Sequence, residues 1–197
     1  MQCVSILKLL NLTILSFLFF LSSYKISYAE MSSLGVLTGG TNSYANGVSI
    51  DGLVIVGYSV SEDGHRAFKY VDGTMSSLGV LTGGTNSYAV GASSNGSVIV
   101  GFSGSTDGDR AFKYVDGTMS SLGVLTGGTS SFAYGVSSDG SVIVGYSDST
   151  DGNRAFKYVD GTMTSLGVLT GGTNSGAVDV GSNGSVIVGL SSSTDGI

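Results

Sequence analysis

The chain holds few residues that could perform catalysis, and their positions do not bring them together. His65 is the only histidine, and positions at successive 44-residue intervals hold Asp109, Asn153 and Ile197 instead. A Ser-His-Asp triad would have to use this single histidine as its base. A Cys-His pair needs a cysteine, and Cys3, near the N-terminus, is the only one. A multi-histidine metal site needs more than one histidine. We therefore expect His65 to be a solvated loop residue.

One loop gathers oxygen ligands. Asp148, Asp151 and Asn153 lie within six consecutive residues, a density of carboxylate and amide oxygens that is typical of calcium loops. The corresponding stretches elsewhere read SVSEDGH, SGSTDGD and SSSTDGI, and no glutamate follows at the spacing of a bidentate ligand. An acidic solvated turn is therefore the preferred interpretation, with weak calcium binding as the alternative.

Two further candidates carry little chemistry. Leu37–Thr41 is glycine-rich but lacks the Gly-Lys-Ser/Thr of a phosphate loop, so it reads as a turn. Asp179 stands where the other copies have glycine (Gly47, Gly91 and Gly135), and drift in a terminal repeat explains it. The sequence therefore assigns no catalytic, cofactor-binding or metal-binding residue, and it predicts that the protein is not an enzyme.

A 44-residue unit organises the rest of the chain. Each copy opens with M-x-S-L-G-V-L-T-G-G-T, and the complete copies close with R-A-F-K-Y-V-D-G-T. A fixed period of this length is the signature of a repeat architecture. The copies cover residues 31–74, 75–118, 119–162 and, in part, 163–197.

Each copy predicts two hairpins and four short strands. In the first copy, Asp51-Gly52 separates YANGVSI from LVIVGYS, and Asp72-Gly73 separates RAFKYV from TMSSLGVL. Asx-Gly between β-rich runs is a strong hairpin signal, in which both turn residues adopt positive φ. The apolar VIVG segment suits a strand packed between neighbouring sheets.

These hairpins predict an all-β fold of tandem four-stranded repeats, β-propeller-like and incomplete. Four strands in about 40–45 residues match a propeller blade, and a single hairpin meander must stack on its neighbours to bury its faces. A β-solenoid is the alternative, although parallel coils do not need two-residue turns. Because the fourth copy stops at Ile197, its Val186–Gly189 strand is expected to have an unpaired edge that could self-associate.

The first 29 residues have the pattern of a secretory signal peptide. Lys8 precedes an uncharged apolar run, Leu9–Leu21, and small residues at Ser27 and Ala29 frame a cleavage site after Ala29. A single-pass anchor is the rival, but the run is shorter than the roughly 20 residues of a span. The predicted domains are thus a leader, residues 1–29, and a β repeat domain, residues 30–197.

The mature domain is acidic and free of thiols. Its 14 acidic and 6 basic residues give a formal net charge of −8, and Cys3 is lost with the leader. Such a surface repels nucleic acid and anionic lipid, so neither is an expected partner, and no membrane insertion of the mature domain is expected.

Two sets of positions recur or vary with the period. Arginine, lysine and aspartate recur at Arg66, Lys69 and Asp72 and in the next two copies, and local pairing of these charges is expected. The largest variation is on the first strand and in the loop before Arg-Ala-Phe. The first-strand position holds, in order, Asn46, Val90, Tyr134 and Val178.

The repeat resembles the HAF-type extracellular repeat of bacterial secreted and autotransporter-like surface proteins. The resemblance lies in Gly135–Ser147, in the Arg-Ala-Phe strand and in L-G-V-L-T-G-G, and it covers nearly all of residues 31–197. Tyr70 stands where the family often has tryptophan, and Thr38 where it often has proline. The resemblance implies an exported bacterial surface protein and no known chemistry.

Two functions are therefore expected, in order of preference. The first is an exported cell-surface or extracellular structural and binding module, adhesin-like and part of an autotransporter-type passenger. Its partner would be a host or cell-surface protein or glycan, and it would need no cofactor. The alternative is an extracellular propeller enzyme acting on polysaccharide, which would need carboxylates held together in a cleft.

Overall fold

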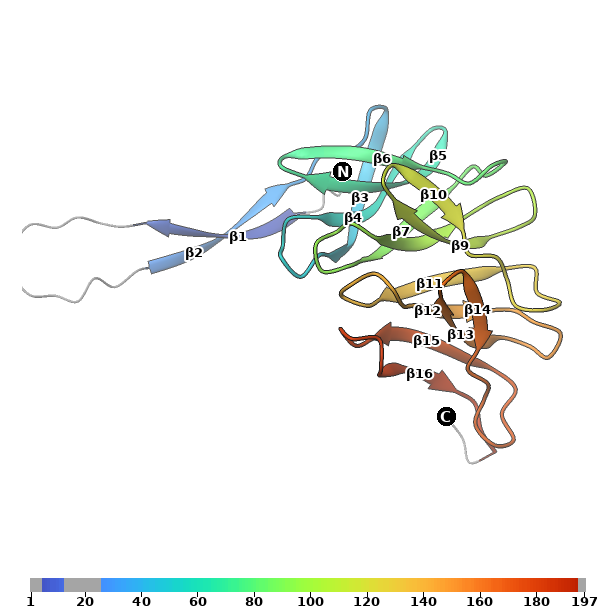
Figure 1. Ribbon diagram of the computed structural model, residues 1–197. Coiled ribbons are helices and arrows are strands. Elements are labelled where there is room, and N and C mark those ends of the chain that lie inside the picture. Colours follow the sequence, from blue (N-terminus) through green and yellow to red (C-terminus); the bar gives the residue numbers. More distant parts are fainter. Residues whose placement is uncertain (1–4, 13–25, 195–197) are drawn as a thin grey trace, which may run out of the picture.

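A computed structural model describes residues 5–12 and 26–194 (Figure 1). β1 (Ser5–Leu12) and β2 (Ile26–Ser33) pair antiparallel and form a two-stranded sheet beside the stacked sheets. The predicted cleavage site after Ala29 falls within β2, whereas residues 13–21 of the predicted apolar run lie outside the described residues. The described ranges contain no helix that is long and apolar enough to cross a membrane.

Three four-stranded antiparallel meanders and a final hairpin follow, which we call blades 1 to 4. Each complete blade takes its fourth strand from the start of the next sequence copy, as Met75 in β6 shows. Blade 1 comprises β3 (Gly40–Val48), β4 (Ile55–Ser61), β5 (Gly64–Val71) and β6 (Thr74–Gly79). Blade 2 comprises β7 (Ser87–Ala92), β8 (Ile99–Ser103), β9 (Arg110–Val115) and β10 (Thr118–Ser121). Blade 3 comprises β11 (Ser131–Val136), β12 (Ile143–Ser147), β13 (Arg154–Val159) and β14 (Thr162–Ser165), and blade 4 comprises β15 (Ser175–Val180) and β16 (Ile187–Ser191).

The predicted fold class is confirmed. The protein is an all-β array of repeated four-stranded sheets that stack on one another without closing into a ring (Figure 1). The solenoid alternative is wrong, because every strand pairing among the described residues is antiparallel. Two hairpins in each complete copy therefore determine the architecture.

The two hairpins use different turns. Asp72 and Gly73 both have positive φ, at 48° and 82°, as a two-residue type I′ turn requires. The same prediction is wrong for the first hairpin, where Gly52 has φ of 74° but Asp51 does not have positive φ. That loop is longer, since the Ser49 N–H donates to the Val54 carbonyl at 2.8 Å. The Asp51 side chain stabilises this loop, because it accepts hydrogen bonds from Ser49 Oγ at 2.6 Å and from the Leu53 N–H at 3.0 Å.

The same loop in blade 3 predicts a specific acid sensitivity. Hydrogen bonds from the Ser137 hydroxyl and from Ser141 lower the pKa of Asp139 from 3.8 to about 2. The unfolded chain therefore binds this proton first, and the free energy of unfolding should fall as the pH drops from about 4 to about 2. Asp139→Asn should lose less stability over that range and match the parent at pH 7, because Asn95 holds the equivalent loop with its amide oxygen. Urea unfolding at both pH values measures this, and equal acid losses in the two proteins would contradict it.

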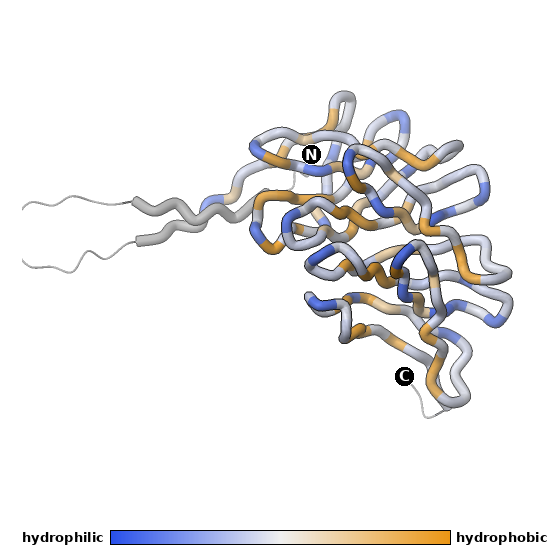
Figure 2. The backbone as a smooth tube through the Cα atoms, in the orientation of Figure 1, coloured by the Kyte–Doolittle hydropathy of each residue, from blue (hydrophilic) through white to orange (hydrophobic). Residues whose placement is uncertain are grey.

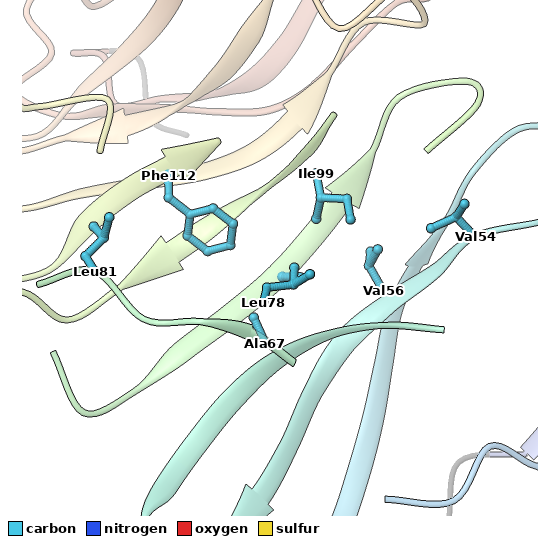
Figure 3. Close-up of a cluster of buried hydrophobic side chains, with 8 residues drawn as sticks. Val54, Val56, Ala67, Leu78, Leu81, Ile99 and Phe112 are labelled. Atoms are coloured by element: carbon cyan, nitrogen blue, oxygen red, sulfur yellow. The ribbon is translucent and has the colours of Figure 1, made fainter. Parts of the chain in front are cut away.

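Hydrophobic packing lies between neighbouring blades. In one cluster, Val56 and Ala67 of blade 1 meet Ile99 and Phe112 of blade 2 (Figure 3). Val100, the next residue along β8, faces the opposite way into the cluster with blade 3, so the VIVG strand is packed on both sides as predicted. Apolar segments run along these strands and polar ones gather at the turns (Figure 2). Each buried phenylalanine contributes about 1.5–3 kcal/mol to stacking.

Buried serines supply the polar half of each blade contact. Ser87 is fully buried, accepts a hydrogen bond from the Ala67 N–H at 2.9 Å and donates to the Gly79 carbonyl at 2.6 Å. Ser131 bridges blades 2 and 3 in the same way. Among the described residues no buried side-chain nitrogen or oxygen lacks a partner. The blades are thus joined by a repeated hydrogen-bonded seam as well as by apolar contact.

Candidate functional site

His65 is part of the contact between blades 1 and 2. Its ring stacks on Tyr58, with centroids 5.4 Å apart, and its Nδ1 lies 2.8 Å from the Tyr88 hydroxyl. The expectation of a solvated loop residue is therefore wrong. The spacing of the repeat placed the tyrosine of the next copy beside it, a contact that no local pattern could reveal.

A row of aromatic rings continues from this point through blades 1 to 3, and we call it the aromatic row. Consecutive ring centroids are 4.8–5.0 Å apart. Rings of one blade are stacked, and rings of adjacent blades meet edge to face, which are the two favourable arrangements for aromatic pairs. In order, its members are Tyr44, Tyr58, Tyr88, Phe102, Phe132 and Tyr146.

The recurring basic residues also reach the next blade. Arg154 Nη1 donates to the Thr173 carbonyl at 2.6 Å, and Arg66 and Arg110 make the same contact with the carbonyls of Thr85 and Thr129. Lys69 and Lys113 lie over the rings of Tyr114 and Tyr158, each 5.8 Å from the centroid. Asp72, Asp116 and Asp160 lie in the type I′ turns, and their local pairing with these basic residues stays a prediction. These charges serve stacking rather than a ligand site.

Asp148 joins two loops of blade 3. Its carboxylate accepts hydrogen bonds at 2.7 Å from the N–H groups of Thr129 and Ser130 and from the Thr129 hydroxyl. Burial raises the pKa of Asp148, but these donors outweigh it and leave the pKa below its usual value. The described residues hold no group of three or more His, Cys, Asp or Glu side chains suited to a metal ion. This geometry favours the structural turn over calcium binding.

The variable first-strand positions come together. Strands β3, β7, β11 and β15 line a pocket of about 350 Å³, which we call the first-strand pocket. It contains Asn46, Val90, Tyr134 and Val178, the variable first-strand position of the four copies, together with Asp179. Residues that are 44 positions apart in the sequence thus line the same pocket.

The first-strand pocket contains three polar side chains that differ in charge and in hydrogen bonding. Burial raises the pKa of Tyr134 to about 12, with Tyr146 adding to the shift, so its hydroxyl keeps its proton at neutral pH. Asn46 Nδ2 donates to the Ala89 carbonyl of blade 2 at 2.9 Å. Asp179 is exposed, and its Oδ1 accepts a hydrogen bond from the Val180 N–H at 2.8 Å. The pocket therefore offers a neutral phenol, an amide and one carboxylate.

Asp179 also shows why the other copies need glycine here. A Cβ on Gly47 would lie 2.6 Å from the Val90 carbonyl oxygen, and one on Gly135 would lie 3.0 Å from Asp179 Cα. Neighbouring first strands approach too closely for a side chain. No described blade lies beyond blade 4, so this constraint is absent at Asp179.

Blade 4 leaves one side exposed. Leu122 and Leu125 are 6% and 9% exposed, whereas their equivalents Leu166 and Leu169 are 46% and 60% exposed. In the inner contact, Phe156 of the next blade packs against the buried leucines. Among the described residues β16 pairs only with β15, so the predicted unpaired edge is present. A pocket of about 350 Å³ lies between β16 and the exposed leucines Leu166 and Leu169.

Two residues near this end were missed by sequence reasoning. Gly176 stands where the other copies have Tyr44, Tyr88 and Phe132, and Leu190 stands where they have tyrosine or phenylalanine. The signal was visible as a loss of aromatic residues in the fourth copy. Its meaning depends on ring contacts between blades, which only the structure supplies.

Solved structures share this architecture. TolB from Acinetobacter baumannii aligns with a TM-score of 0.61 and 12% identity over 81% of this chain, and the putative TolB from Agrobacterium tumefaciens with 0.53 and 15% over 70%. The chain spans 40% and 52% of the lengths of those proteins. TolB proteins are β-propellers, so the stacked meanders define an open β-propeller-like array. Neither a protein-family model nor a curated protein matches the chain.

Proposed function

We propose that the protein is a non-enzymatic binding module, exported to the bacterial cell surface or the extracellular space. It acts as an adhesin-like part of an autotransporter-type passenger. The observation that supports this function is the contrast between positions of the repeat. Positions kept in every copy that contains them, such as Ser87 and Phe112, build the contacts between blades. A first-strand position that holds three different residues in the four copies lies in the first-strand pocket, where a ligand can reach it.

The pocket suits a glycan or a polar protein side chain of a host or cell surface. Tyr134 offers an apolar ring with a hydroxyl donor, and Asp179 offers a carboxylate acceptor. A ring with a polar end is well suited to ligands that are apolar on one face and polar at the rim. The net charge of −8 for residues 30–197 disfavours nucleic acid and anionic membranes as partners.

The alternative of a polysaccharide-cleaving enzyme receives less support. Such chemistry needs two carboxyl groups roughly 5–10 Å apart. The described lining of the first-strand pocket includes one carboxylate, Asp179. Asp51 and Asp139 accept hydrogen bonds from their own loops, and Asp148 accepts them from a second loop of blade 3, so all three hold turns in shape.

The proposal is tested with the released chain. We expect cells that express the precursor to export a chain whose measured mass corresponds to an N-terminus at Glu30. We expect this exported chain to bind saturably to glycan arrays or host cells. Changing both Tyr134→Val and Asp179→Gly should lower that affinity at least about tenfold, because hot-spot truncations cost about 1.4 kcal/mol or more. Both changes introduce residues that other copies carry at these positions, so the fold should persist.

A matched control removes the same charge elsewhere. Glu62→Thr changes an exposed loop residue to the one found at Thr106, and it should leave binding unchanged. Retention of the chain in the cell would count against export. Equal binding by the pocket variant and the Glu62 variant would rule out the first-strand pocket as the binding site.

A further inference from the structure

The aromatic row ends at a pocket between blades 3 and 4. In blade 2, Tyr88 stacks on Phe102 at 4.8 Å and meets Tyr58 of blade 1 edge to face at 4.9 Å. The equivalent residue in blade 4 is Gly176, and a cavity of about 360 Å³ is present there. We call it the last-blade pocket; its lining includes Tyr146, Asn153, Asn174, Gly176 and Leu190.

The backbone around the pocket is the same as where a ring is present. Gly176 pairs with Leu190 in the register that pairs Tyr88 with Phe102. Gly176 does not have positive φ, and an added Cβ would meet nothing closer than Tyr146 Cβ at 3.7 Å. The backbone therefore does not require glycine, and the missing side chain leaves space for a ring on an unchanged frame.

A polar group stands where the ring's hydroxyl would point. Tyr88 directs its hydroxyl to His65 Nδ1 at 2.8 Å, and Asn153 occupies the position of His65 in blade 3. The backbone of Asn153 is fixed, because its N–H donates to Asn174 Oδ1 at 3.1 Å and its carbonyl accepts from the Ser175 N–H at 3.0 Å. Its side-chain amide, at the rim of the pocket, can donate to or accept from a hydroxyl.

We propose that the last-blade pocket binds a phenol ring from outside the chain, which takes the place that Tyr88 has between blades 1 and 2. The ring lies against Leu190, meets Tyr146 edge to face and directs its hydroxyl to Asn153. Three features point to this ligand: an apolar lining, a space that holds an aromatic ring in the two preceding blade contacts, and an amide at the hydroxyl position. The site is separate from the first-strand pocket, so it does not depend on the proposed function.

Ligand-observed NMR titrations test the site with p-cresol, N-acetyltyrosinamide and toluene. The dissociation constant of p-cresol should be on the order of 1 mM, as expected for a ligand of this size. Toluene lacks the hydroxyl and should bind more weakly. Asn153→Ala should weaken p-cresol about 2- to 10-fold, the value of one neutral hydrogen bond, and leave toluene unchanged.

Gly176→Tyr should abolish binding by filling the pocket with the chain's own ring. Gly181→Ser is its matched control, because it also restores a repeat residue in blade 4 but lies outside the lining of the pocket. In the other blades this serine accepts a hydrogen bond, as Ser137 Oγ does from the Val142 N–H at 2.9 Å. Thermal melts of both variants should show folding at least as stable as the parent, and only Gly176→Tyr should lose p-cresol.

The ligands separate two sources of the phenol. If N-acetyltyrosinamide binds at least as tightly as p-cresol, the ring is a tyrosine side chain presented by a polypeptide. If p-cresol alone binds, the ligand is a free small phenol. The proposal is overturned if neither binds saturably, if Gly176→Tyr leaves binding unchanged, or if toluene binds as tightly as p-cresol.

Discussion

Replacing Gly140 with alanine is expected to destabilise the protein much more than replacing Gly52, its counterpart in blade 1. Both have positive φ, at 77° and 74°, and a left-handed backbone costs an alanine about 1–2 kcal/mol. At Gly140 the new Cβ would also lie 2.4 Å from Val98 Cγ2 of blade 2, whereas at Gly52 nothing lies within 4 Å. Overpacking should add about 1–3 kcal/mol at Gly140 alone.

Urea denaturation of the two variants measures this difference directly. Adding Val98→Ala to Gly140→Ala should recover part of the loss, because it removes the methyl group that the new Cβ would meet. A Cβ on Gly96 would lie 2.3 Å from Val54 Cγ2, so Gly96→Ala provides a second test of the same contact. If Gly52→Ala and Gly140→Ala lower the free energy of unfolding equally, the turn at Gly140 does not pack against the preceding blade.

The strands could be predicted because their signals are local. Alternating apolar residues around Asp72-Gly73 predict a type I′ hairpin within a few positions, and the structure has one. Because the unit repeats every 44 residues, the same hairpin is predicted in each complete copy. The first hairpin was predicted in place but with the wrong turn, because Asp51 stabilises its loop through its side chain rather than through positive φ.

The contacts between blades could not be predicted, because they depend on how one repeat lies against the next. Ser87 reads as one more loop serine, yet it is buried and bridges two blades. Arg66 and His65 read as exposed polar residues, and both reach groups about 20 residues further along the chain. The first-strand pocket was foreseen only as a varying position, since sequence alone does not show that four first strands converge.

Extending the chain beyond Ile197 with the segment RAFKYVDGT is expected to raise the melting temperature. The added strand should pair with the free edge of β16 and place its phenylalanine against Leu166 and Leu169, as Phe156 lies against Leu122 and Leu125. Burying that side chain is worth about 1.5–3 kcal/mol, which corresponds to roughly 3–12 °C for a domain of this size. Differential scanning calorimetry measures the shift.

A control extension, RASKYVDGT, can pair with β16 but cannot fill the space beside Leu166. It should give less than half of the gain, since most of the benefit comes from apolar burial rather than from strand pairing. Sedimentation velocity should show that the RAFKYVDGT protein self-associates less than the parent, because a covered edge no longer recruits strands from other copies. If both extensions leave the melting temperature and self-association unchanged, blade 4 does not present the stacking face that blades 1 to 3 use, and the contacts that join the inner blades cannot continue beyond it.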